Sequence, residues 1–193
     1  MPAVARTSPA KIVAAARRIV ERHGPEALSM QAVAHAVGIQ APSMYKHFTD
    51  RAALLRAVSL AVAEHMQRAI ARATTTTNAS DDLRAIARAQ RSYAVRSPHL
   101  YALLFATSDR AAGLADADYA ATSARILDLM AVHGEPRHAL AASRLLVSFV
   151  HGFSTMEAAG AFHLGGSVDD AFEFGLDRIL AAVQRANTTQ PSR

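Results

Sequence analysis

The side chains best suited to chemistry with a partner gather in the first quarter of the chain. Gln40 and Ser43 offer hydrogen-bonding groups of the kind that read DNA base edges, while Tyr45, Lys46 and His47 suit phosphate oxygens. This mixture differs from the Glu and Lys residues of an idle helix surface. The composition therefore predicts a surface that recognises a nucleic acid.

A predicted helix-turn-helix positions these residues. The pattern predicts short helices over 29–37 and 41–47, joined at Gly38, whose missing Cβ permits a left-handed turn. In this motif the second helix enters the major groove and the first crosses the backbone. Both helices are expected to pack on an earlier helix over about 9–23. The residues expected to be buried there are Val33, Ala34, Val37 and Met44.

The charge of the chain is concentrated near its N-terminus. The 193 residues carry a formal net charge of +5. The first 51 residues hold seven basic and three acidic side chains, whereas the remaining 142 hold fourteen basic and thirteen acidic ones. Bulk charge does not distinguish DNA from RNA or a membrane surface. Its position predicts that a polyanionic partner meets the N-terminal part.

The sequence lacks the patterns of common enzyme and metal sites. It contains no Cys, which excludes disulfides, thiolate metal sites and a cysteine nucleophile. His151 and Glu157 are six residues apart, which places them on different sides of a helix. Gly165 and Gly166 are not followed by the Lys and Ser or Thr of a phosphate-binding loop. We therefore expect no catalytic residue, no metal and no cofactor.

The composition predicts an all-α fold, because 44 Ala residues outnumber 11 aromatic ones and Ala is the strongest helix former. Periodicity indicates about nine helices: three in an N-terminal head, then a long one over about 51–73 that leads into a helical body. The later helices are predicted over about 81–97, 99–107, 116–133, 137–162 and 168–186. We expect a head over 1–50, a body over 51–186 and a disordered tail over 187–193.

The helix-turn-helix segment and the start of the next helix resemble a known family, the TetR/AcrR family of bacterial regulators. The residues that carry the resemblance are Ser29, Met30, Val33, Ala34, Val37, Gly38, Ile39, Ala41, Pro42, Ser43, Met44, Tyr45, Lys46, His47, Phe48, Asp50, Arg51 and Leu54. The resemblance implies that Tyr45 and His47 touch DNA phosphates and that Gln40, Pro42 and Ser43 lie nearest the bases. The full set expected at the DNA is Ser29, Gln40, Ala41, Pro42, Ser43, Tyr45, Lys46, His47 and Arg51. The alternative is a three-helix packing module that never touches DNA.

Two residues depart from the family pattern. Gln40 stands where members usually have a small Ser or Thr cap, whose loss costs about 1 kcal/mol. A Gln side chain gains bidentate access to adenine, so we expect base readout there. Arg51 replaces the usual Lys, and we expect it to bind a phosphate because a guanidinium and a helix N-terminus both attract that group.

The segment His151–Phe162 resembles the C-terminal half of one TetR subgroup, in which the last two helices pair with their copies in a second subunit. The resemblance therefore implies a homodimer. The residues expected at its interface are Gly152, Met156, Ala159, Gly160, Phe172, Leu176, Ile179, Leu180 and Val183. For the residues of the last helix, burial inside the chain's own core is the alternative.

The resemblance also implies a pocket for an unknown small-molecule effector. The candidate lining residues are Tyr93, His99, Tyr101, Leu104, Phe105, Tyr119, Met130 and Phe153, and ordinary core is the alternative for each. The predicted function is that of a homodimeric repressor that binds a palindromic DNA operator and is released by its ligand. A helical enzyme with a vestigial head and an architectural DNA-binding protein without an effector are the competing functions. No apolar run reaches the ~20 residues that span a bilayer, so we expect no membrane association and a cytoplasmic protein.

Overall fold

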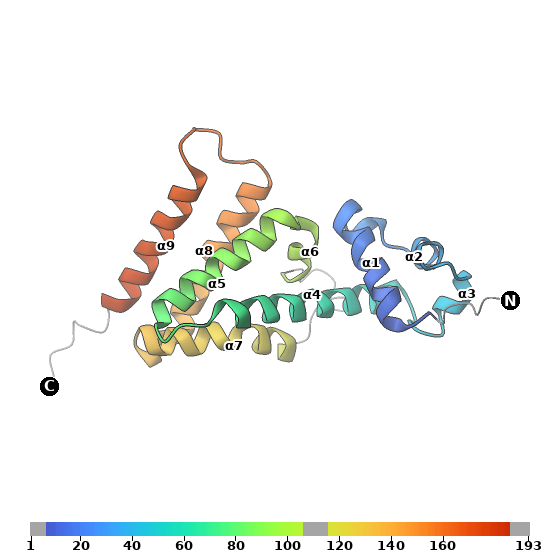
Figure 1. Ribbon diagram of the computed structural model, residues 1–193, viewed down its shortest axis with the longest axis horizontal. Coiled ribbons are helices and arrows are strands. Elements are labelled where there is room, and N and C mark those ends of the chain that lie inside the picture. Colours follow the sequence, from blue (N-terminus) through green and yellow to red (C-terminus); the bar gives the residue numbers. More distant parts are fainter. Residues whose placement is uncertain (1–6, 106–115, 186–193) are drawn as a thin grey trace. The chain divides into compact units, whose positions relative to one another are not determined.

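The computed structural model describes residues 7–105 and 116–185, and within them all side chains except those of 116–122 and 185. Throughout these ranges the fold is all-α, as the composition predicts (Figure 1). The elements are α1 (Pro9–His23), the 3-10 turn η1 (Pro25–Ala27), α2 (Met30–Val37), α3 (Ala41–Met44), α4 (Arg51–Ala73), α5 (Ala79–Arg96), α6 (Pro98–Leu103), α7 (Asp116–His133), the 3-10 turn η2 (Pro136–His138), α8 (Ala139–Ala158) and α9 (Val168–Arg185).

The chain forms two compact units. Within the described residues, the first unit comprises residues 7–65, 97–105 and 116–118, and the second comprises residues 66–96 and 119–185. Helices α4 and α7 each contribute to both units. The predicted tail over 187–193 lies outside the described residues.

Helix α1 begins and ends at the predicted residues. The Ser8 hydroxyl accepts a hydrogen bond from the Lys11 amide at 3.4 Å, and Pro9 occupies the first helical position, where its missing N–H costs nothing. The apolar residues Ile12 and Val20 are fully buried, because their spacing places them on one face of the helix. Helix α1 therefore supports α2, η1 and α6, which pack against it.

Helix α6 packs against α1 within the first unit. The Ser97 hydroxyl donates to the Glu21 carboxylate at 3.0 Å, and a His99 ring nitrogen lies 3.3 Å from the Glu21 carbonyl oxygen. Helix α6 begins at Pro98, one residue earlier than predicted, since Pro is favourable in a first turn. It ends at Leu103, and the predicted end at Thr107 lies outside the described residues.

The second unit is built around α5 and α8, whose apolar faces bury Ile86, Ala87, Leu146 and Val150. Helix α8 was predicted over 137–162 but ends at Ala158. Its last turn closes with a hydrogen bond at 2.9 Å, which the Ala161 amide donates to the Met156 carbonyl. Gly160, which lies within this turn, has a positive φ of 68°. This turn is a common helix terminus and stops the helix early.

Helix α9 packs against α8 (Figure 1). The rings of Phe149 and Phe172 stack at 5.5 Å between centroids. Gly175 faces the same ring, and a Cβ added there would lie 2.5 Å from Phe149 Cζ. A larger residue at this position would force the Phe149 ring to move, so the glycine permits the close approach of the two helices.

Three of the residues predicted at the dimer interface lie in the core of the single chain. Phe172, Leu176 and Leu180 are almost completely buried within a single chain. A side chain that is already buried has no apolar surface left to remove from water against a partner. Intramolecular core, the alternative weighed for this helix, describes them.

Three arginines of α5 pair with carboxylates of α9, and we call this set the arginine ladder. Its pairs are Arg84 with Asp177, Arg88 with Glu173 (2.7 Å), and Arg91 with Asp169 (2.7 Å). The pairing order shows that α5 and α9 are antiparallel. Arg91 also forms two hydrogen bonds with Glu157 of α8, at 2.6 and 2.7 Å. Its guanidinium carbon lies 4.8 Å from the Phe172 ring centroid, so Arg91 joins three elements.

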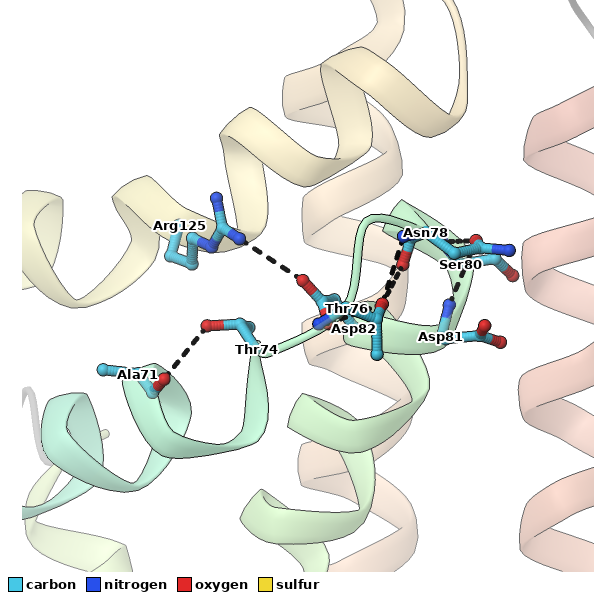
Figure 2. A network of polar contacts seen from close by, with 8 residues as sticks. All are labelled: Ala71, Thr74, Thr76, Asn78, Ser80, Asp81, Asp82 and Arg125. Carbon is cyan, nitrogen blue, oxygen red and sulfur yellow. Dashed lines mark hydrogen bonds and ion pairs between the residues drawn. The ribbon is translucent and has the colours of Figure 1, made fainter.

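The α4–α5 connection is fastened by a buried carboxylate (Figure 2). Asp82 is 1% exposed and accepts hydrogen bonds from the Thr76 amide (3.1 Å), the Thr76 hydroxyl (3.0 Å) and the Arg125 guanidinium (3.3 Å). The Asn78 side chain accepts from the Ser80 amide at 2.9 Å. Helix α5 therefore begins at Ala79, two residues before the predicted start, because an Asn cap precedes the acidic pair.

Replacing Arg91 with Met should lower the free energy of unfolding by about 2 kcal/mol, because Glu157, only 20% exposed, loses both of its hydrogen bonds from the guanidinium. Urea titration checks this. The matched control is Arg88→Met, whose pair is 56% and 36% exposed and should contribute at most about 0.5 kcal/mol. Equal losses in the two variants would contradict the ranking.

The Glu173 carboxyl should make the stability of the second unit depend on pH. Hydrogen bonds from Arg88 hold the pKa of Glu173 below its usual value. A group with a depressed folded-state pKa stabilises the fold above its unfolded pKa, and this contribution is lost as the pH falls through the folded pKa. The stability difference between the wild-type chain and Glu173→Gln should therefore be largest near neutral pH and shrink below about pH 4. Urea midpoints across this range test it, and a difference independent of pH would contradict it.

Candidate nucleic-acid interface

Helix α2 is fixed at both ends by the predicted residues. The Ser29 hydroxyl accepts from the Ala32 amide at 3.1 Å, which satisfies one of the free amides of the first turn. At the other end Gly38 adopts a left-handed conformation (φ +74°), and the Ile39 amide donates to the Ala34 carbonyl at 3.0 Å. This end geometry sets the direction in which the chain enters α3.

Helix α3 is shorter than predicted, since it ends at Met44 rather than His47. The amides of His47 and Phe48 both donate to the Met44 carbonyl, at 2.9 and 3.0 Å, so the chain tightens into a turn. Tyr45 and Lys46 lie in that turn. Met44 is fully buried and anchors the whole segment in the first unit.

Most of the predicted DNA-binding side chains are exposed on this segment. Tyr45 is 58% exposed although it is aromatic, and Lys46 and His47 are exposed beside it. The other exposed residues of the set are Ser29, Gln40 and Pro42, and the half-buried ones are Ala41, Ser43 and Arg51. The segment therefore presents aromatic, basic and polar groups together.

Gln40 occupies the N-cap position of α3 but its side chain makes no capping hydrogen bond. The side chain is exposed, so its amide can hydrogen-bond to a partner. This arrangement is compatible with the base readout expected from the sequence.

Arg51 makes contacts that the sequence did not indicate. Its Nε donates to the Leu28 carbonyl at 2.8 Å and one terminal nitrogen donates to the Pro25 carbonyl at 2.6 Å. The same nitrogen lies 3.7 Å from the Glu26 carboxylate. The two carbonyls are 23 and 26 residues away, and no local sequence pattern signals such a contact.

The predicted pocket residues fall into both units. In the first unit Tyr101 and Leu104 are buried, Phe105 is half-buried and His99 is exposed; burial raises the pKa of Tyr101. The rings of Tyr101 and Phe105 lie 5.2 Å apart. In the second unit the predicted residues are Tyr93 and Met130, both buried, and Phe153, which is half-buried. The Tyr119 side chain lies outside the described residues.

A cavity of about 170 Å³ lies where α8 leads into α9. Phe153 belongs to the predicted pocket set, and sequence reasoning missed the other residues that line this cavity. The lining residues are Phe153, Ala161, Phe162, His163, Leu164, Gly165, Ser167, Val168 and Ala171.

Several apolar side chains of α8 and α9 face solvent. Among the predicted interface residues Met156 is 49% exposed and Ala159 and Gly160 are exposed, while Gly152, Ile179 and Val183 are half-buried. Leu145 and Phe174 are also exposed, although sequence reasoning did not single them out. Phe174 lies two positions from both Phe172 and Leu176, which places it on the opposite side of α9. This spacing could have predicted from the sequence that Phe174 is exposed.

None of the helices in the ranges 7–105 and 116–185 is long and apolar enough to cross a membrane.

Replacing Gln40 with Ser should add the missing cap to α3. A Ser at this position accepts a hydrogen bond from a first-turn amide, so the free energy of unfolding of the first unit should rise by about 0.5 to 1 kcal/mol. Gln40→Ala is the control, because it removes the same amide without adding a cap. Urea titration of both variants measures the difference, and a Ser variant no more stable than the Ala variant would contradict the expectation.

Both halves of the chain match models of known protein families. Residues 12–58 match the family model for bacterial regulatory proteins of the tetR family, and residues 83–179 match the model for the tetracyclin repressor-like C-terminal domain. The HTH-type transcriptional regulator Rv1816 of Mycobacterium tuberculosis is 36% identical over 117 residues, which is 55% of this chain and 50% of that protein. The present chain thus spans about half the length of this curated relative.

Solved structures have the same fold. A protein of unknown function from Rhodococcus sp. RHA1 superposes with a TM-score of 0.80 at 22% identity, over 95% of this chain and 99% of that one. A TetR variant from Acinetobacter baumannii AYE, in complex with minocycline, gives 0.69 at 22% identity over 94% and 99%. At this identity the likeness concerns the fold alone. The two family models decide the assignment: the chain belongs to the TetR family of bacterial regulatory proteins.

Proposed function

We propose that this chain is a DNA-binding transcriptional regulator that acts in the cytoplasm as a homodimeric, ligand-released repressor. The observation that carries the proposal is the exposed turn of Tyr45, Lys46 and His47, held next to the buried Met44. A Tyr hydroxyl followed by two side chains that can carry positive charge is suited to a phosphate backbone. In this proposal the chain acts by binding and catalyses no reaction.

The charge distribution supports a phosphate partner. The first 51 residues carry most of the net positive charge, and Lys11, Arg18 and Arg22 of α1 are exposed. Each phosphate that a protein neutralises releases a counterion, so the binding constant falls steeply with salt concentration. The residues proposed to contact DNA base edges are Gln40 and Ser43, at the start of α3.

Two copies of the chain are proposed to bind a palindromic operator. The α3 helices of the two copies would then lie about one DNA turn (34 to 36 Å) apart. The exposed apolar side chains of α8 and α9, among them Met156 and Phe174, support a self-complementary interface. The residues that we retain from the sequence prediction are Gly152, Met156, Ala159, Gly160, Ile179 and Val183. Phe172, Leu176 and Leu180 stay in the core of each chain.

A small-molecule effector is proposed to release the operator. The complex of the Acinetobacter protein with minocycline shows that this fold accommodates a small molecule in that protein. A ligand shifts a conformational equilibrium only by its differential affinity for the two states. The proposed effector binds better to a state in which the heads are held at the wrong spacing for the operator.

Gel-shift titration against DNA flanking the gene, with random competitor and at two salt concentrations, tests the proposal. The wild-type chain should bind saturably, and Tyr45→Ala should weaken binding at least about tenfold, or about 1.4 kcal/mol. Tyr45 is largely exposed, so this variant should unfold at an unchanged temperature.

Val132→Ala is the matched control, because Val132 is an exposed apolar residue of the second unit and its loss should leave DNA binding unchanged. Equal affinity for random competitor and flanking DNA would contradict a sequence-specific regulator.

A further inference from the structure

The guanidinium of Arg51 is engaged by the protein's own backbone. Two of its nitrogens donate short hydrogen bonds, at 2.8 Å to Leu28 and 2.6 Å to Pro25. Both acceptors are main-chain carbonyls of the connection between α1 and α2, and both bonds are partly buried. A planar guanidinium presents donors in a fixed fork, and this geometry suits two neighbouring acceptors.

The two carbonyls lie at structurally important positions. Leu28 is 1% exposed and directly precedes Ser29, whose hydroxyl caps α2. Pro25 begins the turn η1 that follows α1. Arg51 itself is the first residue of α4, and the Asp50 carboxylate before it accepts from the Ala53 amide at 2.7 Å. One side chain therefore joins the beginning of α4 to the beginnings of η1 and α2.

The two hydrogen bonds use two of the five guanidinium N–H donors and hold the side chain at the carbonyls, so a movement of this side chain towards DNA competes with them. Moving Arg51 to a phosphate would break both hydrogen bonds and leave two partly buried carbonyls without their charged donor. The Glu26 carboxylate near the same nitrogen is 96% exposed and 3.7 Å away, so it adds little to the binding of the guanidinium. The carbonyl pair is the principal partner.

We propose that Arg51 is a positioning residue, whose fork sets the orientation of the helix-turn-helix on α4, and that it is not a phosphate ligand. The inference rests on the proposed DNA-binding function and replaces the role expected from the sequence. It also explains why Arg stands at this position instead of Lys. A lysine ammonium keeps the charge but lacks the rigid planar fork, so it does not hold the two carbonyls in a fixed geometry.

Two substitutions separate the roles through the dependence of DNA affinity on salt. If Arg51 positions the head, Arg51→Lys and Arg51→Gln should both lower operator affinity about tenfold and leave the slope of log K against log salt unchanged. Lys46→Gln, which removes a proposed phosphate contact, should lower the magnitude of that slope by about 0.9. Glu26→Gln should have no effect. If Arg51→Lys restores wild-type affinity while Arg51→Gln lowers the slope like Lys46→Gln, Arg51 is a phosphate ligand and the proposal is overturned.

The ratio of operator to competitor affinity distinguishes positioning from a general loss of folded protein. A partly unfolded chain binds both DNAs less by the same factor, whereas a misoriented head loses operator affinity and keeps its non-specific affinity. Arg51→Lys should therefore reduce the ratio about tenfold. An unchanged ratio would overturn the proposal.

Amide hydrogen exchange of the DNA-free chain tests the same contact without reference to DNA. Arg51→Lys should speed exchange in the segment from Pro25 to Ala32 at least about fivefold, while Glu26→Gln leaves it unchanged. Unchanged exchange in Arg51→Lys would overturn the proposal. If instead the wild-type chain shows no selective DNA binding, the proposed function fails while this exchange result still decides whether Arg51 fixes the connection.

Discussion

The recognition surface depends on a helix that cannot be stable in isolation. Helix α3 has four residues, and a single turn fixes more backbone freedom than its hydrogen bonds recover. Burial of Met44 therefore holds it, together with the left-handed turn at Gly38 that orients it relative to α2. The exposed groups between Gln40 and His47 are positioned by these two features. The buried methionine thus supports the proposed interface by holding α3 in place.

The second unit is organised around α5, which packs on α8 through its apolar face and pairs with α9 through the arginine ladder. Arg91 combines two carboxylate partners with contact to the Phe172 ring, so charge and apolar packing act at one point. At the other end of α5, the buried Asp82 receives hydrogen bonds from the α4–α5 connection and from Arg125 of α7. Both ends of α5 are thus tied to neighbouring elements by charged side chains.

Local signals predicted much of the fold. Ser8, Ser29 and Gly38 gave correct helix ends because capping depends on residues within one turn. The end of α3 was missed because its closing turn uses backbone groups that any residue carries. The fork of Arg51 was invisible to sequence reasoning, since it joins residues more than twenty positions apart. The apolar stripe of α9 was recognised, but periodicity alone does not tell whether such a stripe meets its own chain or a copy.

The contact between Gly175 and Phe149 links two positions that lie 26 residues apart in the chain. Any side chain at 175 would enter the space of the Phe149 ring, so a larger residue there displaces the ring and is accommodated best by a smaller residue at 149. In related sequences the two positions should therefore vary together, as volumes that compensate each other. Phe174, next to Gly175 but exposed, is free of this condition. On the face of α9 that packs against α8, the residue types are thus coupled to those of α8. On the opposite face, the residue types can differ from one regulator to the next.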